Sequence, residues 1–188
     1  MNHPRPPAAN WLSPKIDIRE TPPKGKGMFA REAIAAGEVV VLWGGEFVDG
    51  EGASKAHAAG KRTMQWDDDL FSIDNGREDP AYLINHSCDA NVWMEDAFTL
   101  TAKRPIAAGD EITVDYALFV ADEEYVSRWE CRCGSSGCRG RVTGRDWESA
   151  AVQGKYRGHF SPLLNKRIEG REGGLAAGKT RRFNAGDS

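Results

Sequence analysis

The cysteines of this chain limit its fold more than any other feature of the sequence. Three of the four, Cys131, Cys133 and Cys138, form a C-x-C-x4-C arrangement. Two thiolates two residues apart, followed by a third after a Gly-Ser turn, can occupy three corners of a tetrahedral zinc site. Cys88 is the only other cysteine. A site made of all four thiolates would therefore tie a late segment to the middle of the chain.

The sequence leaves other arrangements of these cysteines open. His86 or His159 could supply the fourth zinc ligand in place of Cys88, and free buried thiols or a disulfide would also use the same residues. The first residues, 1–7, have neither the apolar core nor the cleavage pattern of a signal peptide. We therefore predict a reducing compartment, where a structural zinc site is favoured over disulfides.

Composition indicates one globular domain of ordinary size. The chain has 188 residues, of which 40% are hydrophobic and 28% charged, and its formal net charge is −3. No apolar run approaches the roughly 20 residues that span a bilayer, and a nucleic-acid-binding domain is usually strongly basic. We expect no membrane and no direct nucleic-acid partner. We also expect a cytoplasmic location in a bacterial cell, with a nuclear location as the alternative.

Short β-rich segments separated by Gly and Asp predict a mainly β domain. Residues 15–19 alternate polar and apolar side chains, as a half-buried strand does. The segment 50–61 is rich in Ala, Gly and Lys and is expected to be a short helix or a loop. The further strand candidates are residues 47–48, 70–73, 92–94 and 98–101.

One turn sequence occurs twice. Residues 34–38, Ile-Ala-Ala-Gly-Glu, recur as residues 106–110, Ile-Ala-Ala-Gly-Asp, and a β-rich run follows each copy. The glycines, Gly37 and Gly109, can supply the positive φ of a tight turn before a strand. Two copies are too few for a solenoid, so we interpret them as one turn used twice.

The pattern becomes helical after the cysteine cluster. Asp146 can cap a helix that begins at Trp147, and Ser161 followed by Pro162 can begin another. From Gly170 onward Gly, Arg and Lys dominate, which predicts a disordered tail.

Four motifs in a fixed order carry a resemblance to a known family. They are Gly25-Lys26-Gly27, the Asn-His-Ser-Cys-Asp-Ala-Asn run at 85–91, the Gly-Asp-Glu-Ile-Thr-Val-Asp-Tyr run at 109–116, and the late cysteine cluster. Together they resemble the signature of SET-domain protein-lysine methyltransferases, with a post-SET zinc motif. The resemblance extends from about Lys15 to Gly140.

The resemblance implies a mainly β SET fold, a β-clip of several small sheets with a threaded, knot-like C-terminal segment, plus short C-terminal helices. We accordingly expect a flexible N-terminus over 1–13 and a SET domain over 14–120. A post-SET zinc-binding segment over 121–142, a helical extension over 143–169 and a disordered tail over 170–188 would follow.

The resemblance also implies an activity and a set of site residues. The activity is S-adenosylmethionine-dependent methyl transfer to the ε-amine of a lysine in a protein or peptide. Tyr116 matches the catalytic tyrosine of the family, and Cys88 would join the three late cysteines on zinc. The donor-binding residues implied by the family's motifs are Gly25, Lys26, Gly27, Met28, Asn85 and His86.

Trp43, Tyr82, Val114 and Phe119 are the candidates to line the channel for the substrate lysine. The residues at 43, 82 and 114 depart from those common in the family, so the number of methyl groups added is not predicted. A substrate with a basic tail would suit the acidic clusters at 67–69 and 122–124, although such clusters are equally typical of solvated loops.

Physical chemistry sets what such a site must do. Less than about 0.1% of free lysine is neutral at pH 7, because its pKa is about 10.4. The site must favour the neutral amine by desolvation and by proximity to the positively charged donor. Alignment of the reactants can then contribute roughly 7–11 kcal/mol. Tyr116 would orient the amine through its hydroxyl oxygen.

Two other functions compete with this prediction. The main alternative is a non-catalytic SET-like module that binds a partner protein, but such a module has no need to retain Asn85, His86 and Tyr116 together. A zinc hydrolase is disfavoured, because four cysteine ligands leave no open position on the metal.

Overall fold

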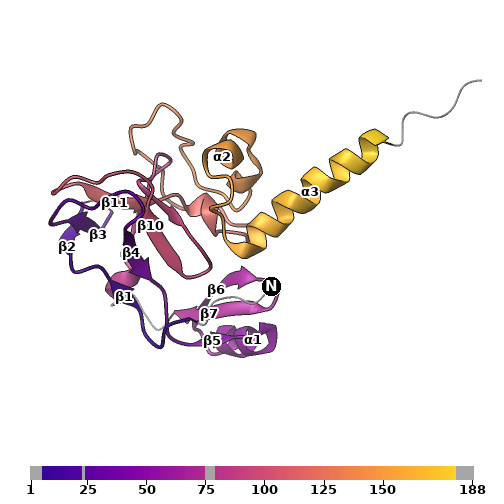
Figure 1. The fold of residues 1–188 in the computed structure, drawn as a ribbon. Coiled ribbons are helices and arrows are strands. Elements are labelled where there is room, and N and C mark those ends of the chain that lie inside the picture. Colours follow the sequence, from indigo (N-terminus) through magenta and orange to yellow (C-terminus); the bar gives the residue numbers. More distant parts are fainter. Residues whose placement is uncertain (1–5, 23, 75–78, 181–188) are drawn as a thin grey trace, which may run out of the picture.

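Strands make up most of the regular structure between the N-terminus and the cysteine cluster. The computed structural model describes residues 6–22, 24–74 and 79–180 (Figure 1). In chain order the strands are β1 (Trp11–Leu12), β2 (Ile16–Glu20), β3 (Lys26–Ala30), β4 (Val39–Leu42), β5 (Phe47–Val48), β6 (Arg62–Asp67), β7 (Leu70–Asp74), β8 (Asn85–His86), β9 (Val92–Met94), β10 (Thr99–Ala102) and β11 (Glu111–Val114). The predicted mainly β class is confirmed, and β6 lies outside the predicted strands.

Helices are concentrated near the C-terminus. They are α1 (Gly50–Ala58), α2 (Ala150–Lys155) and α3 (Pro162–Thr180), with short 3-10 turns η1 (Pro80–Tyr82), η2 (Tyr116–Leu118) and η3 (Asp146–Glu148). The segment predicted as a helix or a loop is thus the helix α1. Its N-cap residue Asp49 accepts a hydrogen bond from the Gly52 amide, which satisfies one of the free donors of the first turn.

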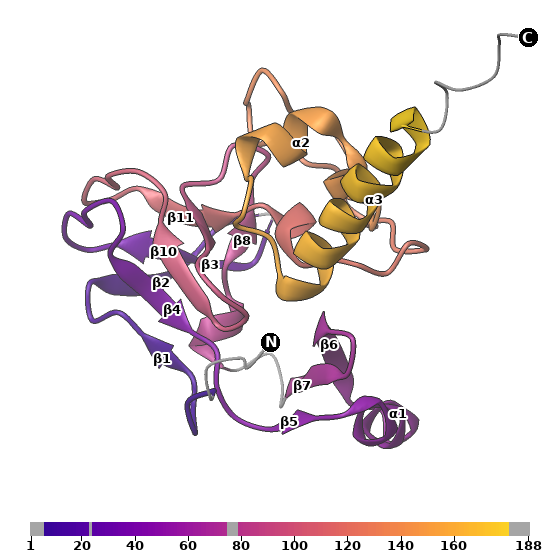
Figure 2. The same ribbon diagram turned by 45° about the vertical axis from the view of Figure 1, so that its right-hand side comes forward.

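The strands form one large and one small sheet. The large sheet has the order β1-β4-β10-β9-β11-β3-β2, and β8 pairs with β11 beside this path. The small sheet has the order β5-β7-β6 and lies together with α1 on one side of the body (Figures 1 and 2). β6 and β5 are therefore the two edge strands of the small sheet.

The duplicated turn is confirmed. Gly37 and Gly109 have φ angles of 81° and 93°, which residues with a Cβ rarely adopt. The two copies also pair with each other, because the Ile34 and Ile106 amides each donate to the carbonyl of the other, at 3.0 and 2.9 Å. The two copies of the turn therefore lie side by side, although they are about 70 residues apart in the sequence.

β11 brings the Asn-His motif beside the motif that ends at Tyr116. It pairs in parallel with β8, which sets Thr113 opposite Asn85 and Val114 opposite His86. Asn91 closes the same region, because its side chain accepts from the Thr113 amide at 2.9 Å and donates to the Glu111 carbonyl at 2.8 Å. Segments about 25 residues apart in sequence are thereby held side by side.

The C-terminal extension packs onto the domain through large buried side chains. Trp147 and Tyr156 are fully buried, and Phe160 and Leu164 join the same core. α2 and the start of α3 lie against the body, whereas the far end of α3 projects away from it in both views (Figures 1 and 2).

Three expectations about the first residues and the C-terminal extension differ from the structure. β1 pairs with β4, so residues 11–12 are part of the sheet rather than of a flexible segment. α3 continues to Thr180, past the boundary predicted at 169, and the rest of the expected tail, 181–188, lies outside the described residues. Asp146 is the first residue of η3 rather than a cap, and its carboxylate binds the Arg139 side chain instead.

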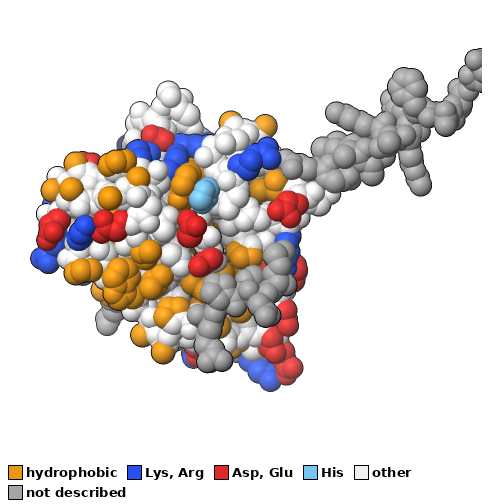
Figure 3. All heavy atoms as spheres, in the orientation of Figure 1, with side chains coloured by type: hydrophobic (Ala, Val, Ile, Leu, Met, Phe, Trp, Pro, Cys, Tyr) orange, Lys and Arg blue, Asp and Glu red, His pale blue; other side chains and the backbone are white. Residues whose placement is uncertain are grey.

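No helix in the described ranges is both long enough and apolar enough to cross a membrane. Charged side chains of both signs are scattered over the face seen in Figure 3, and hydrophobic side chains gather in the region of β1 and β4. Trp11 of β1 is 41% exposed.

Gly144 lies where the segment after the late cysteines touches the segment before them. A Cβ built on Gly144 would lie 1.5 Å from the Asp122 carbonyl oxygen, so the backbone must move to admit any side chain. Gly144→Ala is expected to lower the free energy of unfolding by about 2–4 kcal/mol, as measured by chemical denaturation. Gly154→Ala is the matched control in α2, where a Cβ meets open space, and it should leave stability unchanged or raise it by up to about 1 kcal/mol. Equal midpoints for the two variants would contradict the packing described here.

Candidate active site

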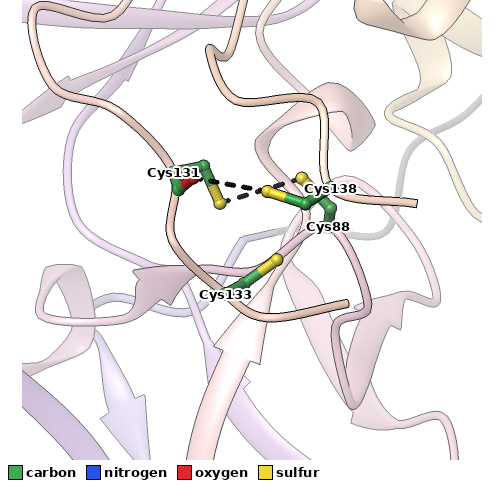
Figure 4. Close-up of side chains that lie close together, drawn as sticks. All are labelled: Cys88, Cys131, Cys133 and Cys138. Carbon is green, nitrogen blue, oxygen red and sulfur yellow. Dashed lines mark hydrogen bonds between the residues drawn. The ribbon is translucent and has the colours of Figure 1, made fainter. Parts of the chain in front are cut away.

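The four cysteines, Cys88, Cys131, Cys133 and Cys138, form one cluster. Their sulfur atoms all lie within 4.8 Å of one another, and they point toward a common centre (Figure 4). The Cys88 and Cys131 sulfurs are 3.8 Å apart. In a tetrahedral site with Zn–S bonds of about 2.3 Å, neighbouring sulfurs lie about 3.8 Å apart. The donor set and its spacing therefore fit a structural zinc ion.

The surroundings of Cys88 also suit a thiolate bound to a cation. Burial raises the pKa of the Cys88 thiol to about 12, because a buried thiolate loses its hydration. A divalent cation would reverse this balance. The Arg139 amide also donates toward the Cys88 sulfur, at 3.4 Å. The alternative of a disulfide is not realised, since all four cysteines are free.

The two histidines considered as fourth ligands have other roles. His86 Nδ1 accepts from the Tyr116 amide at 3.2 Å, so Nε2 carries the proton and faces the Cys88 sulfur at 3.3 Å. Burial lowers the pKa of His86 to about 4, which keeps the ring neutral. His159 stacks on Trp93 with ring centroids 3.5 Å apart.

Asn85 and Gly27 form a close contact between β8 and β3. Asn85 Nδ2 donates to Glu111 Oε1 at 2.8 Å and to the Lys26 carbonyl at 3.3 Å. A Cβ on Gly27 would lie 2.5 Å from Asn85 Nδ2, so a glycine is needed for this approach. The structure thus brings the predicted donor-binding motifs together.

The other residues of the glycine motif differ in their surroundings. Gly25 has a φ angle of 88° and forms the turn before β3. Lys26 is exposed, whereas the Met28 side chain is fully buried in the core. Met28 can therefore present only its backbone to a ligand in this arrangement.

Tyr116 lies directly after β11 at the start of η2. Its hydroxyl donates to the Ile84 carbonyl at 2.9 Å, and its ring centroid is 5.2 Å from that of His86. Burial raises the pKa of Tyr116 to about 12, so the phenol stays protonated at neutral pH. The hydroxyl is therefore held beside the Asn-His motif.

Tyr116 also lines a cavity of about 540 Å³. Three of the four predicted channel residues, Trp43, Tyr82 and Phe119, line it. Val114 is fully buried in β11 and does not belong to the lining. The full lining consists of Trp43, Thr63, Met64, Gln65, Trp66, Phe71, Ser72, Tyr82, Ile84, Tyr116, Phe119, Val120, Ala121, Asp122 and Tyr125.

Aromatic rings form the inner wall of this cavity. Trp43 contacts Trp66 and Phe119, with centroids 5.0 and 5.8 Å apart, and Phe119 lies 5.6 Å from Tyr116. Both indole N–H groups are engaged within the protein. Trp43 donates to the Ala81 carbonyl at 3.1 Å, and Trp66 donates to the Ser72 hydroxyl at 2.8 Å. The rings therefore present mainly their carbon surfaces to any group bound in the cavity.

Sequence reasoning missed two groups at the site. Trp129 is 42% exposed, yet its ring lies 5.7 Å from His86 and 6.2 Å from Tyr116. Arg139 forms a two-pronged ion pair with Asp115, which precedes the tyrosine. The only signal in the sequence is their position at the two borders of the cysteine cluster.

The acidic clusters are only partly available to a substrate. Asp67 and Asp68 both form ion pairs with Lys166 of α3. Asp122 lines the cavity and is exposed. Attraction of a basic tail by the cluster at 122–124 stays a prediction.

Comparison with known proteins identifies the family to which this site belongs. Residues 25–117 match the family described as SET domain. The chain belongs to the SET-domain family. The matched region ends directly after Tyr116, so the cysteines at 131–138 lie beyond it and their relation to the SET domain rests on the sulfur cluster itself.

Similar proteins include much longer histone-lysine methyltransferases. Histone-lysine N-methyltransferase ATX2 of Arabidopsis thaliana is 33% identical over 139 residues, which cover 66% of this chain and 12% of that protein. Histone-lysine N-methyltransferase SETD1 of Drosophila melanogaster is 31% identical over 130 residues, which cover 62% of this chain and 8% of that protein. The chain therefore spans a small part of the length of these relatives.

A solved structure is similar in fold. The methyltransferase domain of human Histone-lysine N-methyltransferase SETMAR superimposes with a TM-score of 0.54 and 18% sequence identity, covering 69% of this chain and 58% of that chain. The predicted SET fold is confirmed by this likeness.

Proposed function

We propose that this SET domain transfers a methyl group from S-adenosylmethionine to the ε-amine of a lysine in a protein. The observation that carries the proposal is the position of Tyr116. Its hydroxyl is fixed on the Ile84 carbonyl, beside Asn85 and His86, while its ring lines an aromatic cavity. One phenol thus borders both the predicted donor side and the predicted lysine channel.

The donor side has the features that a nucleoside-like cofactor needs. Gly25, Lys26 and Gly27 offer backbone groups, the Asn85 side chain lies directly beside them, and His86 follows Asn85 in β8. The bound donor supplies an activated methyl group on a sulfonium. Trp129 adds an aromatic face next to His86 that a planar base can stack on. Met28 would contribute through its backbone alone.

The acceptor side suits the stem of an extended lysine. The carbon faces of Trp43, Trp66 and Phe119 exclude water from the amine, and desolvation lowers the pKa of an ammonium group. Tyr116 then orients the neutral amine, and alignment supplies much of the acceleration.

The border of the cavity favours a peptide as the substrate. Residues 63–65 of β6, an edge strand of the small sheet, line the cavity. An extended peptide can pair with such a strand while one side chain enters a pocket. The named relatives are histone-lysine methyltransferases, so a basic histone-like tail is the first substrate class to test.

The four cysteines would hold a structural zinc ion that connects residues 131–138 to Cys88. Cys88 lies two residues after His86, so the ion would brace the predicted donor side. Four sulfur ligands would fill the coordination sphere, so the metal would have no open position for catalysis. The cytoplasmic location, with its nuclear alternative, stays a prediction.

Tyr116→Phe tests the reaction. We expect the parent protein to transfer label from S-adenosylmethionine to a histone mixture or a cell extract, and the variant to lose activity by about 10²-fold or more, because the amine loses its orienting oxygen. Donor affinity measured by calorimetry should change little. Tyr156→Phe is the matched control, since it removes a buried hydroxyl outside the cavity.

Absence of donor binding by the parent protein would favour the alternative of a non-catalytic binding module. Equal activity of the Tyr116→Phe variant and the parent would contradict the role given to the phenol.

Metal content tests the cysteine cluster. We expect about one zinc per chain by elemental analysis, and Cys133→Ser should lose it because one corner of the tetrahedron is removed. Ser135→Ala, which removes the hydroxyl 3.3 Å from the Cys133 sulfur, should keep the metal. A chelator should lower the melting temperature of the parent protein. Full zinc occupancy in Cys133→Ser would refute a four-cysteine site.

The pH dependence tests which group ionises. Tyr116 keeps its proton because burial raises its pKa to about 12, whereas a substrate lysine has an ordinary pKa of about 10.4. Label transfer should therefore increase from pH 7 to pH 10 as the neutral amine becomes more abundant. A loss of activity within this range, in a protein still folded by circular dichroism, would count against a protonated phenol.

A further inference from the structure

We infer that Arg139 is a positioning residue, which holds Tyr116 in place through Asp115. The Arg139 guanidinium binds the Asp115 carboxylate in a two-pronged geometry, with N–O distances of 2.9 and 2.5 Å. Asp115 is fully buried, and it directly precedes the tyrosine. The part of the inference that concerns rate rests on the proposed function, and the part that concerns geometry stands alone.

Asp115 transmits this interaction to the turn that carries Tyr116. Its Oδ1 accepts from the Ala117 amide at 3.1 Å, so it caps η2. A buried carboxylate without a cation is strongly unfavourable and must protonate or move. Loss of the guanidinium would thus weaken the cap and free the start of η2.

Arg139 is itself fixed from two further directions. Its amide donates toward the Cys88 sulfur at 3.4 Å, which ties its backbone to the cysteine cluster. Its Nε donates to Asp146 Oδ2 at 2.8 Å, and the Thr143 hydroxyl holds the other oxygen of Asp146 at 2.7 Å. The cysteine cluster and the C-terminal extension therefore both set the direction of the guanidinium.

This geometry needs an arginine rather than a positive charge alone. A lysine would keep the charge but lacks the planar fork that binds both carboxylate oxygens. It also cannot bind Asp115 and Asp146 at the same time with fixed directions. The substitution Arg139→Lys therefore separates charge compensation from positioning.

The variants to compare are Arg139→Lys, Arg139→Met and the control Arg145→Met. Arg145 lies in the same segment, and its ion pair with Glu123 is exposed to solvent. Each protein is purified as the full chain, and its zinc content and melting temperature are measured. Hydrogen exchange is then followed at the amides of residues 117–120, which bond within the turn or to its cap.

We expect Arg139→Lys to keep its zinc and its fold but to exchange the amides of 117–120 faster than the parent. Exchange in the β2–β3 hairpin should be unchanged. For label transfer, kcat should fall about 10- to 100-fold, as small misplacements of reacting groups do, with little change in the KM for the protein substrate. Arg145→Met should match the parent in every measurement.

Parent-like exchange at 117–120 in Arg139→Lys would overturn the inference, whatever its activity. Faster exchange with an unchanged kcat would overturn the link to catalysis. If Arg139→Met does not fold, Arg139→Lys alone decides. If the parent protein transfers no label, the proposed function fails, and the exchange data still decide whether Arg139 holds η2.

Discussion

The parallel pairing of β8 with β11 is the constraint on which the rest of the site depends. It sets Asn85 opposite Thr113 and His86 opposite Val114. Because Tyr116 follows two residues after Val114, its amide reaches His86 and its hydroxyl reaches the Ile84 carbonyl. Two segments that carry separate parts of the predicted chemistry thus share one short stretch of backbone hydrogen bonds.

Residues from the late part of the chain also bind to this stretch. Cys88 follows His86 and meets the three late cysteines, while the Asp115 carboxylate before Tyr116 meets Arg139. Arg139 follows Cys138 directly, so one segment contributes both a sulfur and a cation. The cysteine cluster and the buried ion pair are therefore two attachments of the same loop to the two halves of the site.

Much of this site could be predicted from sequence, because its parts are local. The late cysteines form a metal-ligand pattern by their own spacing, whereas Gly27 and the Asn-His pair were identified through the resemblance of their motifs to those of the family. The prediction failed where the partner is remote. Val114 was expected in the channel, but it is fully buried in β11 and is not among the residues that line the cavity. Asp146 was expected to cap a helix, but its carboxylate binds Arg139 instead.

The sequence by itself determined the mainly β class, the turn used at both Gly37 and Gly109, the start of α3 at Pro162 and the ligand chemistry of four thiols. These follow from backbone preferences and from interactions within a few residues. Only the tertiary structure decided that Arg139 meets Asp115, that β6 borders the cavity and that Trp129 lies beside His86. Such contacts join residues far apart in the chain, and packing selects them from many partners that the sequence alone allows.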